Sequence, residues 1–180
     1  MLEVSDIVKE YDFNTERKRV LDNIRFSVAD GEILGITGKS GSGKTTLLKI
    51  LRGIESFDGG SFRLGELEIT STSEKETIRS LQLSSAIHLQ RNFGLWNGPA
   101  IENIIRRLNF QYTSDEGLPE PDSLYYDDMY EEAMGYMKLV GLEDKALHSS
   151  NLLSGGEKQR LIMARQLAAK PKMLLLDEPV

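Results

Sequence analysis

The stretch Gly38-Lys39-Ser40-Gly41-Ser42-Gly43-Lys44-Thr45 fits the pattern G-x-x-x-x-G-K-[ST] in full. A short apolar run at residues 33–36 precedes it and predicts a buried strand of a parallel sheet, and a helical pattern follows at residues 47–51. Glycines allow successive backbone N–H groups to turn inward, and the start of a helix adds partial positive charge. A glycine-rich loop in this setting predicts a phosphate-binding site.

Each position of this loop has an expected role in holding a nucleoside triphosphate. Lys44 is expected to reach the β- and γ-phosphates, and the Thr45 hydroxyl is expected to ligate Mg²⁺. The other residues expected to line the phosphates are Gly38, Lys39, Ser40, Gly41, Ser42, Gly43 and Thr46. A glycine-rich turn without function is the alternative, and the far end of the chain argues against it.

Two carboxylates lie at that far end. Asp177 follows the four apolar residues 173–176, which predict a buried strand, and P-loop enzymes place a carboxylate that helps hold Mg²⁺ at such a strand end. Glu178 points to the other side of the strand and is a candidate base for an attacking water. Such a pair alone is more often a solvated turn. Together with the phosphate loop it predicts a hydrolytic site.

Local patterns predict an α/β chain with a single domain over residues 1–180. Strands are expected at residues 2–8, 24–28 and 86–89, with a hairpin at 62–69 that turns at Gly65, and helices at 47–51, 99–109, 124–140 and 154–170. Residues 1–90 are expected to be a mainly β-rich core, residues 91–153 mainly helical, and residues 154–180 a helix and a strand. Residues 109–122 are expected to be a solvated connector.

Composition narrows the function classes. The net charge of −6 and the lack of a basic run argue against broad nucleic-acid affinity, so no nucleic-acid partner is expected. The absence of cysteine excludes disulfides, thiolate metal sites and cysteine nucleophiles. No apolar run reaches the length of a membrane span, and the amino terminus lacks the features of a signal peptide, so a cytoplasmic location is expected.

The stretch Leu153-Ser154-Gly155-Gly156-Glu157-Lys158-Gln159-Arg160 resembles the signature motif of ATP-binding-cassette (ABC) ATPases, and it opens a helix that Ser154 can cap. The order of phosphate loop, signature and Asp-Glu pair is also the order in that family. The resemblance implies a P-loop NTPase fold with a RecA-like mixed core sheet, an antiparallel β-subdomain and an α-helical signature subdomain. It implies ATP and Mg²⁺ as ligands.

Two domains of this family pair head to tail around ATP. The resemblance implies that Ser154, Gly155 and Gly156 contact ATP held by a second ABC domain, in the same chain or in a homodimer. Gln90 is similar to the family's Q-loop glutamine, which reaches Mg²⁺ or the attacking water. Tyr11 looks like the aromatic residue that stacks on adenine, with Phe13 as the alternative.

Other family features have no match within these residues. Neither His88, expected in a strand, nor His148, expected at the surface, matches the family's switch histidine. That histidine and the D-loop are expected beyond Val180, so the carboxy-terminal portion of the domain is expected to be missing and the 180 residues alone are expected to hydrolyse ATP weakly.

The kind of ABC ATPase is a finer question. Residues 51–57, 89–96 and 101–103 resemble component A2 of the methyl-coenzyme M reductase system, a soluble archaeal protein with two ABC domains that is implicated in ATP-dependent activation of the reductase. The main prediction is a soluble energy-coupling ATPase of that type, with reductase-activation proteins as partners. One alternative is the ATP-binding subunit of a transporter, with a membrane permease as partner. A second is a module that binds ATP without hydrolysing it.

Overall fold

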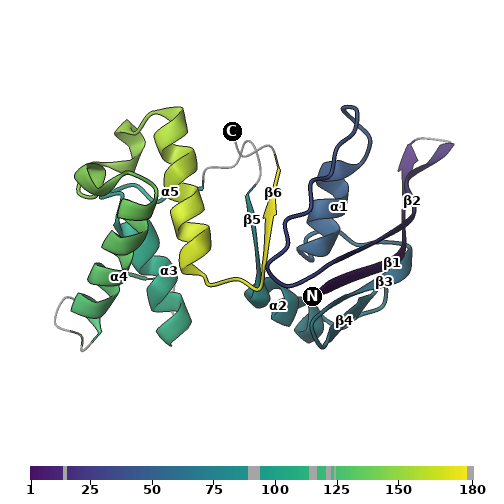
Figure 1. Ribbon diagram of the computed structural model, residues 1–180, viewed down its shortest axis with the longest axis horizontal. Helices are drawn as coiled ribbons and strands as arrows, with labels where there is room; N and C mark the ends of the chain where they lie inside the picture. The colour runs from purple at the N-terminus through teal and green to yellow at the C-terminus, as the bar shows by residue number, and fades with distance from the viewer. Residues whose placement is uncertain (14–15, 89–93, 114–116, 121–122, 124, 178–180) are drawn as a thin grey trace. The chain divides into compact units, whose positions relative to one another are not determined.

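The computed structural model describes all of residues 1–180 except 14–15, 89–93, 114–116, 121–122, 124 and 178–180, which are drawn in grey in Figure 1. The chain divides into two compact units. The first comprises Met1–Ile87 with Lys172–Asp177, and the second contains His88–Pro171. Each unit has its own hydrophobic core and is described by itself.

An antiparallel four-stranded sheet forms one side of the first unit, in the order β2-β1-β3-β4 (Figure 1). Its strands are β1 (Leu2–Phe13), β2 (Glu16–Val28), β3 (Gly59–Leu64) and β4 (Leu67–Thr70). The predicted strands at residues 2–8 and 24–28 are confirmed, as is the hairpin. Gly65 turns that hairpin at a φ of 61°, a left-handed conformation that favours glycine.

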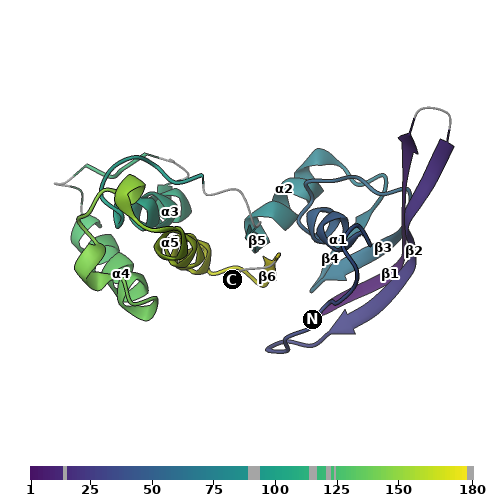
Figure 2. The same ribbon diagram turned by 90° about the horizontal axis from the view of Figure 1, so that it is seen from above.

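Two helices and a small second sheet complete this unit (Figure 2). Helix α1 (Lys44–Leu51) was predicted, whereas α2 (Lys75–Ser84) was not. Helix α2 has an apolar side, with Leu81 buried and Ile78 packed against the core, but this side is only one turn long and the surrounding residues are polar. Strands β5 (Ser85–His88) and β6 (Met173–Leu176) pair with each other. The shared core contains Leu47, Ile50, Leu51, Phe62, Ile69, Leu81 and Leu175.

The strand predicted at residues 33–36 is wrong. These residues have no regular secondary structure, and Ile33 is 96% exposed. An apolar run becomes a buried strand only where a neighbouring strand supplies backbone hydrogen bonds. Within the described ranges, the two sheets use β1–β4 and β5–β6, and neither includes this run.

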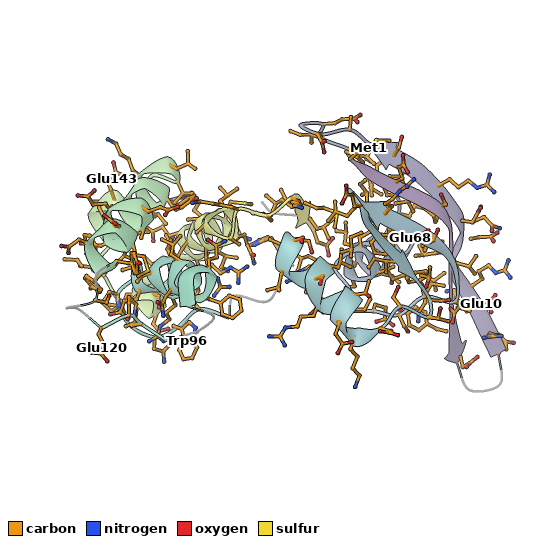
Figure 3. All side chains as sticks on the ribbon, turned by 90° about the horizontal axis from the view of Figure 1, so that it is seen from below. Met1, Glu10, Glu68, Trp96, Glu120 and Glu143 are labelled. Atoms are coloured by element: carbon orange, nitrogen blue, oxygen red, sulfur yellow. The ribbon has the colours of Figure 1, made fainter. Side chains whose placement is uncertain are left out.

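The second unit is helical. It contains α3 (Glu102–Thr113), α4 (Tyr126–Leu139) and α5 (Gly155–Ala168), with short 3₁₀ turns η1 (Glu143–Lys145) and η2 (Ser150–Leu152). The three helices contact one another around a core that includes Ile104, Leu108, Ala133, Met137 and Leu161. Charged side chains such as Glu120 and Glu143 lie on its surface (Figure 3).

Helix α5 and strand β6 belong to different units. Helix α5 packs with α3 and α4 in the second unit, while β6 belongs to the first. In the described part of the chain, no helix is long and apolar enough to cross a membrane.

Candidate nucleotide-binding site

Gly43 fixes the phosphate loop against strand β2. It is the N-cap of α1 with a φ of 93°, which strains any residue with a side chain. A Cβ atom at this position would lie 2.9 Å from Leu21 Cδ2 and 3.0 Å from Val20 Cγ1. The start of α1 therefore rests directly on β2, and only glycine allows this approach.

Lys44 holds the loop in a tight curl. Its Nζ atom donates hydrogen bonds to the carbonyl oxygens of Gly38, at 2.8 Å, and Lys39, at 3.1 Å. The backbone N–H of Ser42 also donates to the Lys39 carbonyl, at 3.2 Å. A Cβ atom on Gly38 would lie 2.8 Å from Ser42 Oγ, so a side chain at this position would displace the Ser42 hydroxyl. The curl places an ammonium group beside the positive end of α1.

The loop is open to solvent. The side of it formed by Lys39, Ser40, Gly41 and Ser42 is exposed, and so is Thr45, while Gly43, Lys44 and Thr46 are half-buried. Backbone N–H groups, ammonium groups and hydroxyls are thus accessible around the start of one helix. This arrangement can bind a polyphosphate.

Thr45 and Asp177 meet although 132 positions separate them. The Thr45 hydroxyl donates a 2.7 Å hydrogen bond to Asp177 Oδ2. Mg²⁺ prefers oxygen ligands and usually takes one or two carboxylates together with substrate phosphates and waters. Among the described residues there is no cluster of three or more His, Cys, Asp or Glu side chains. The pair fits a magnesium ion bound mainly by phosphate rather than an all-protein metal cage.

Other predicted site residues are placed less completely. Gln90 and Glu178 lie outside the described residues, as does the side chain of Phe13. Tyr11 is half-buried in β1, where it pairs with Lys18 of β2. Lys9, which the sequence did not single out, lies with its Nζ atom 4.8 Å from the centroid of the Tyr11 ring.

The signature residues form the start of helix α5. The Ser154 hydroxyl accepts a hydrogen bond from the backbone N–H of Glu157 at 3.4 Å, and the Ser154 N–H donates to Glu157 Oε2 at 2.7 Å. This reciprocal capping box confirms the predicted N-cap. Gly155 and Gly156 are exposed in the first turn. The helix start therefore presents N–H groups and a hydroxyl to solvent.

The two histidines differ in burial. His88 is the last residue of β5 and is buried, and burial lowers the pKa of its imidazole. His148 is exposed, as predicted. Burial also lowers the pKa of Arg165 on α5, whose Nη1 atom donates a 2.7 Å hydrogen bond to the Gly94 carbonyl.

A glycine-rich loop that begins a helix, with an aspartate from a distant strand on its threonine, defines a P-loop nucleotide-binding domain. The model of the ABC transporter family matches residues 21–180. The chain belongs to that family and has the fold of its ATPase cassettes. ATP with Mg²⁺ is the ligand that such domains bind.

Relatives and solved structures agree with this assignment. An uncharacterized ABC transporter ATP-binding protein, MJ1662, of Methanocaldococcus jannaschii is 43% identical over 99% of this chain and 30% of its own length. The methionine import ATP-binding protein MetN of Clostridium tetani is 36% identical over 99% of this chain and 51% of its own. The phosphonates import ATP-binding protein PhnC of Fusobacterium nucleatum is 34% identical over 100% of this chain and 70% of its own length.

Among solved structures, the ATP-binding cassette MJ0796, a dimer bound to ADP and phosphate after hydrolysis, superposes with a TM-score of 0.83. It is 28% identical and is matched over 100% of this chain and 75% of its own. The chain thus spans 30% of the length of the first of these relatives and about half of the length of the second.

If Thr45 and Asp177 hold Mg²⁺, Thr45→Val and Asp177→Asn should each weaken binding of Mg-ATP by roughly tenfold or more, since even outer-shell substitutions have effects of that size. Binding of ATP in the presence of a chelator should change little, because the phosphate cradle is intact. Isothermal titration with and without Mg²⁺ measures both. Thr77→Val on α2 is the matched control, and equal losses with and without Mg²⁺ would contradict the assignment.

The capping box predicts a pH dependence of stability. Hydrogen bonds from the Ser154 N–H and hydroxyl lower the pKa of Glu157 in the folded chain. A depressed carboxyl pKa stabilises the fold fully above the unfolded pKa, about 4.3, and that contribution is lost as the pH falls through the lower folded pKa. Urea unfolding should therefore show a gap between wild type and Glu157→Gln that is largest at neutral pH and shrinks in acid. Glu131→Gln, on an exposed part of α4, should show no such gap.

Proposed function

We propose that this cassette is the ATP-binding subunit of a membrane transporter and that it hydrolyses ATP to drive transport. The observation that carries the proposal is the meeting of Thr45 and Asp177 at 2.7 Å beside the curled phosphate loop, in a chain of the ABC transporter family. Two of its relatives are named for import of methionine and of phosphonates. The proposal concerns ATP hydrolysis as the driving reaction and does not depend on which substrate the transporter carries.

The proposed chemistry is in-line attack of water on the γ-phosphate. Lys44 and the start of α1 would bind the phosphates, and Thr45 with Asp177 would hold Mg²⁺, which neutralises charge on the transferred group. Glu178 would accept the proton of the attacking water, and Gln90 would orient that water or contact the metal. Catalysis of this kind depends on positioning and on charge neutralisation rather than on covalent chemistry.

The proposed site is completed by a second cassette. The exposed start of α5 offers the Ser154 hydroxyl, the N–H groups near Gly155 and Gly156, and a partial positive charge to the γ-phosphate bound by a partner. The dimer of MJ0796 with ADP and phosphate supports pairing as the working state. ATP binding would close the pair and hydrolysis would reopen it.

The relatives favour a transporter subunit over an A2-like protein. Their names refer to transporter ATP-binding proteins, and those described above give no support to reductase activation. The likeness to component A2 in residues 51–57, 89–96 and 101–103 remains a prediction from the sequence. A module that only binds ATP is disfavoured by the presence of Lys44, Asp177 and Glu178 together.

Substitution of Ser154 separates capping from pairing. Asparagine caps helices as well as serine does but lacks the hydroxyl, so Ser154→Asn should leave the unfolding midpoint nearly unchanged and should weaken ATP-dependent dimerisation. Ser154→Ala should lower both, with about 1 kcal/mol of stability lost with the cap. Analytical ultracentrifugation with ATP and thermal unfolding provide the two readouts. Normal dimerisation of Ser154→Asn would exclude the hydroxyl from the partner's site.

The transport proposal is tested on the full-length protein in its native membrane. We expect a permease encoded nearby to co-purify with it and to alter its ATPase rate, and Glu178→Gln to abolish turnover while leaving ATP binding intact. Equal turnover in Glu178→Gln would remove that residue as the base. Recovery of the protein with reductase-activation components, and no permease, would instead favour the A2-like function.

A further inference from the structure

A β-bulge in strand β2 lies beside the phosphate loop. Lys9 of β1 pairs with Leu21, whereas the next residue, Glu10, pairs with Arg19, so Val20 is an extra residue in β2. Val20 and Leu21 are the residues that lie against Gly43. The irregular point of the hairpin is thus the point that contacts the loop.

Lys9 lies on the face of the sheet that carries the loop. Residues directly opposite each other in an antiparallel pair share a face, and Lys9 is opposite Leu21, whose side chain faces Gly43. Lys9 is only 6% exposed. Its Nζ atom lies 3.3 Å from Glu55 Oε1 and donates to Ser56 Oγ at 3.4 Å. A buried ammonium with these partners has a fixed position.

The same ammonium contacts Tyr11. Its Nζ atom lies over the ring, 4.8 Å from the centroid, within the range of a cation–π interaction. Tyr11 pairs with Lys18, two residues from Val20, so the register places it about 7 Å along the sheet from the contact with Gly43. Part of the Tyr11 side chain is exposed. The partly exposed Tyr11 ring therefore lies on the sheet close to the phosphate loop.

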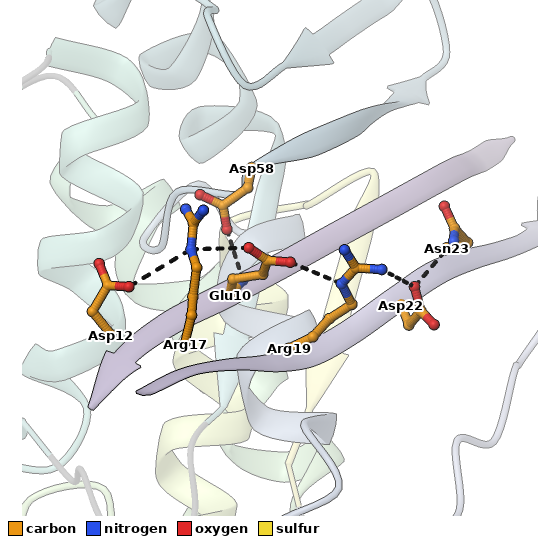
Figure 4. Close-up of polar contacts among 7 residues, drawn as sticks. All are labelled: Glu10, Asp12, Arg17, Arg19, Asp22, Asn23 and Asp58. Carbon is orange, nitrogen blue, oxygen red and sulfur yellow. Dashed lines mark hydrogen bonds and ion pairs between the residues drawn. The ribbon is translucent and has the colours of Figure 1, made fainter. Parts of the chain in front are cut away.

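Glu10, which lies between Lys9 and Tyr11 in β1, is held in place by ion pairs with two arginines (Figure 4). Its carboxylate contacts Arg17 Nε at 3.0 Å and Arg19 Nε at 2.8 Å, and its backbone N–H donates to Asp58 Oδ2 at 2.7 Å. Strand β1 is therefore anchored at Lys9 and at Glu10, immediately before Tyr11. These contacts restrict the motion of the strand that carries the ring.

We propose that Lys9 is a positioning residue that, fixed by Glu55 and Ser56, orients the Tyr11 ring to stack on the purine base of a nucleotide whose phosphates lie in the loop 38–45. The inference rests on the proposed nucleotide site and adds a determinant of base recognition to it. A ring that is oriented before binding loses less conformational freedom on binding, which raises affinity. Lys9 acts through Tyr11 and touches no phosphate.

This role has a distinct experimental signature. Lys9→Met removes the cation but retains a long apolar side chain, and it should weaken ATP binding about fivefold, the effect of losing one partly buried cation–π contact. Binding of inorganic tripolyphosphate, which has no base, should not change. Titration calorimetry of the purified full-length protein measures both ligands. Lys75→Met, an exposed residue in the first turn of α2, is the matched control for loss of one positive charge.

Further variants identify the pathway of the effect. Lys9→Arg should restore ATP affinity because a guanidinium also stacks on an aromatic ring. Tyr11→Ala should weaken ATP but not tripolyphosphate, and Lys9→Met should add little in a Tyr11→Ala background, since the two act as one unit. If Lys9→Met does not fold, Glu55→Gln, which releases the ammonium, is compared with wild type in the same way.

Several outcomes would overturn the proposal. Equal losses for ATP and tripolyphosphate would mean that Lys9 supports the whole fold or the phosphate loop, and unchanged ATP binding by Lys9→Met would remove its role. A base-specific loss in Phe13→Ala but not in Tyr11→Ala would assign stacking to the alternative residue. If wild-type protein binds neither ligand, the proposed nucleotide site itself fails, and the inference fails with it.

Discussion

The hydrogen bond between the Thr45 hydroxyl and Asp177 joins the start of helix α1 to the end of strand β6. It forms only when the first unit has folded around both, because β6 arrives in that unit after the entire helical unit has been traversed along the chain. Burial of Met173 and Leu175 with Leu47 and Ile50 brings the two elements together. Packing of the hydrophobic core therefore sets the distance between the Thr45 hydroxyl oxygen and Asp177 Oδ2, the two oxygen atoms that would bind Mg²⁺. The hydrogen bond between them depends on correct packing of that core.

Most elements were predictable because they carry a local pattern. The phosphate loop is defined by residue type and spacing, the hairpin by alternation around Gly65, and α5 by a capping box that residues 154–157 contain entirely. The prediction of a strand at residues 33–36 failed because a strand needs a partner strand, often far away in the sequence, and local composition does not reveal that partner. Helix α2 was missed because its apolar side is short: Ile78 and Leu81 face the core one turn apart, which gives the helical spacing too few repeats to stand out.

Only part of the nucleotide-binding site was predictable from the sequence. Thr45 and Asp177 could be paired from motif order alone, whereas the contribution of Lys9 could not, because a single lysine two residues before a tyrosine is unremarkable in a sequence. Its burial and its contacts with Glu55 and Ser56 arise from a turn 46 positions later in the chain. The same limit applies to the helical unit, where Arg165 reaches the Gly94 carbonyl from 71 positions away. Local residues thus identify the chemistry, and distant ones determine its geometry.

The bulge at Val20 has a consequence for how this domain tolerates variation. Val20 and Leu21 are ordinary aliphatic residues that touch no ligand, yet they occupy the space into which a side chain at Gly43 would extend. A larger residue at position 20 would displace the amino end of α1, and with it the N–H groups that face the phosphates. Substitutions at positions 20 and 21 of strand β2 are therefore constrained by nucleotide affinity, although neither residue contacts the nucleotide. A change in side-chain volume at one of these positions would need a compensating change at the other.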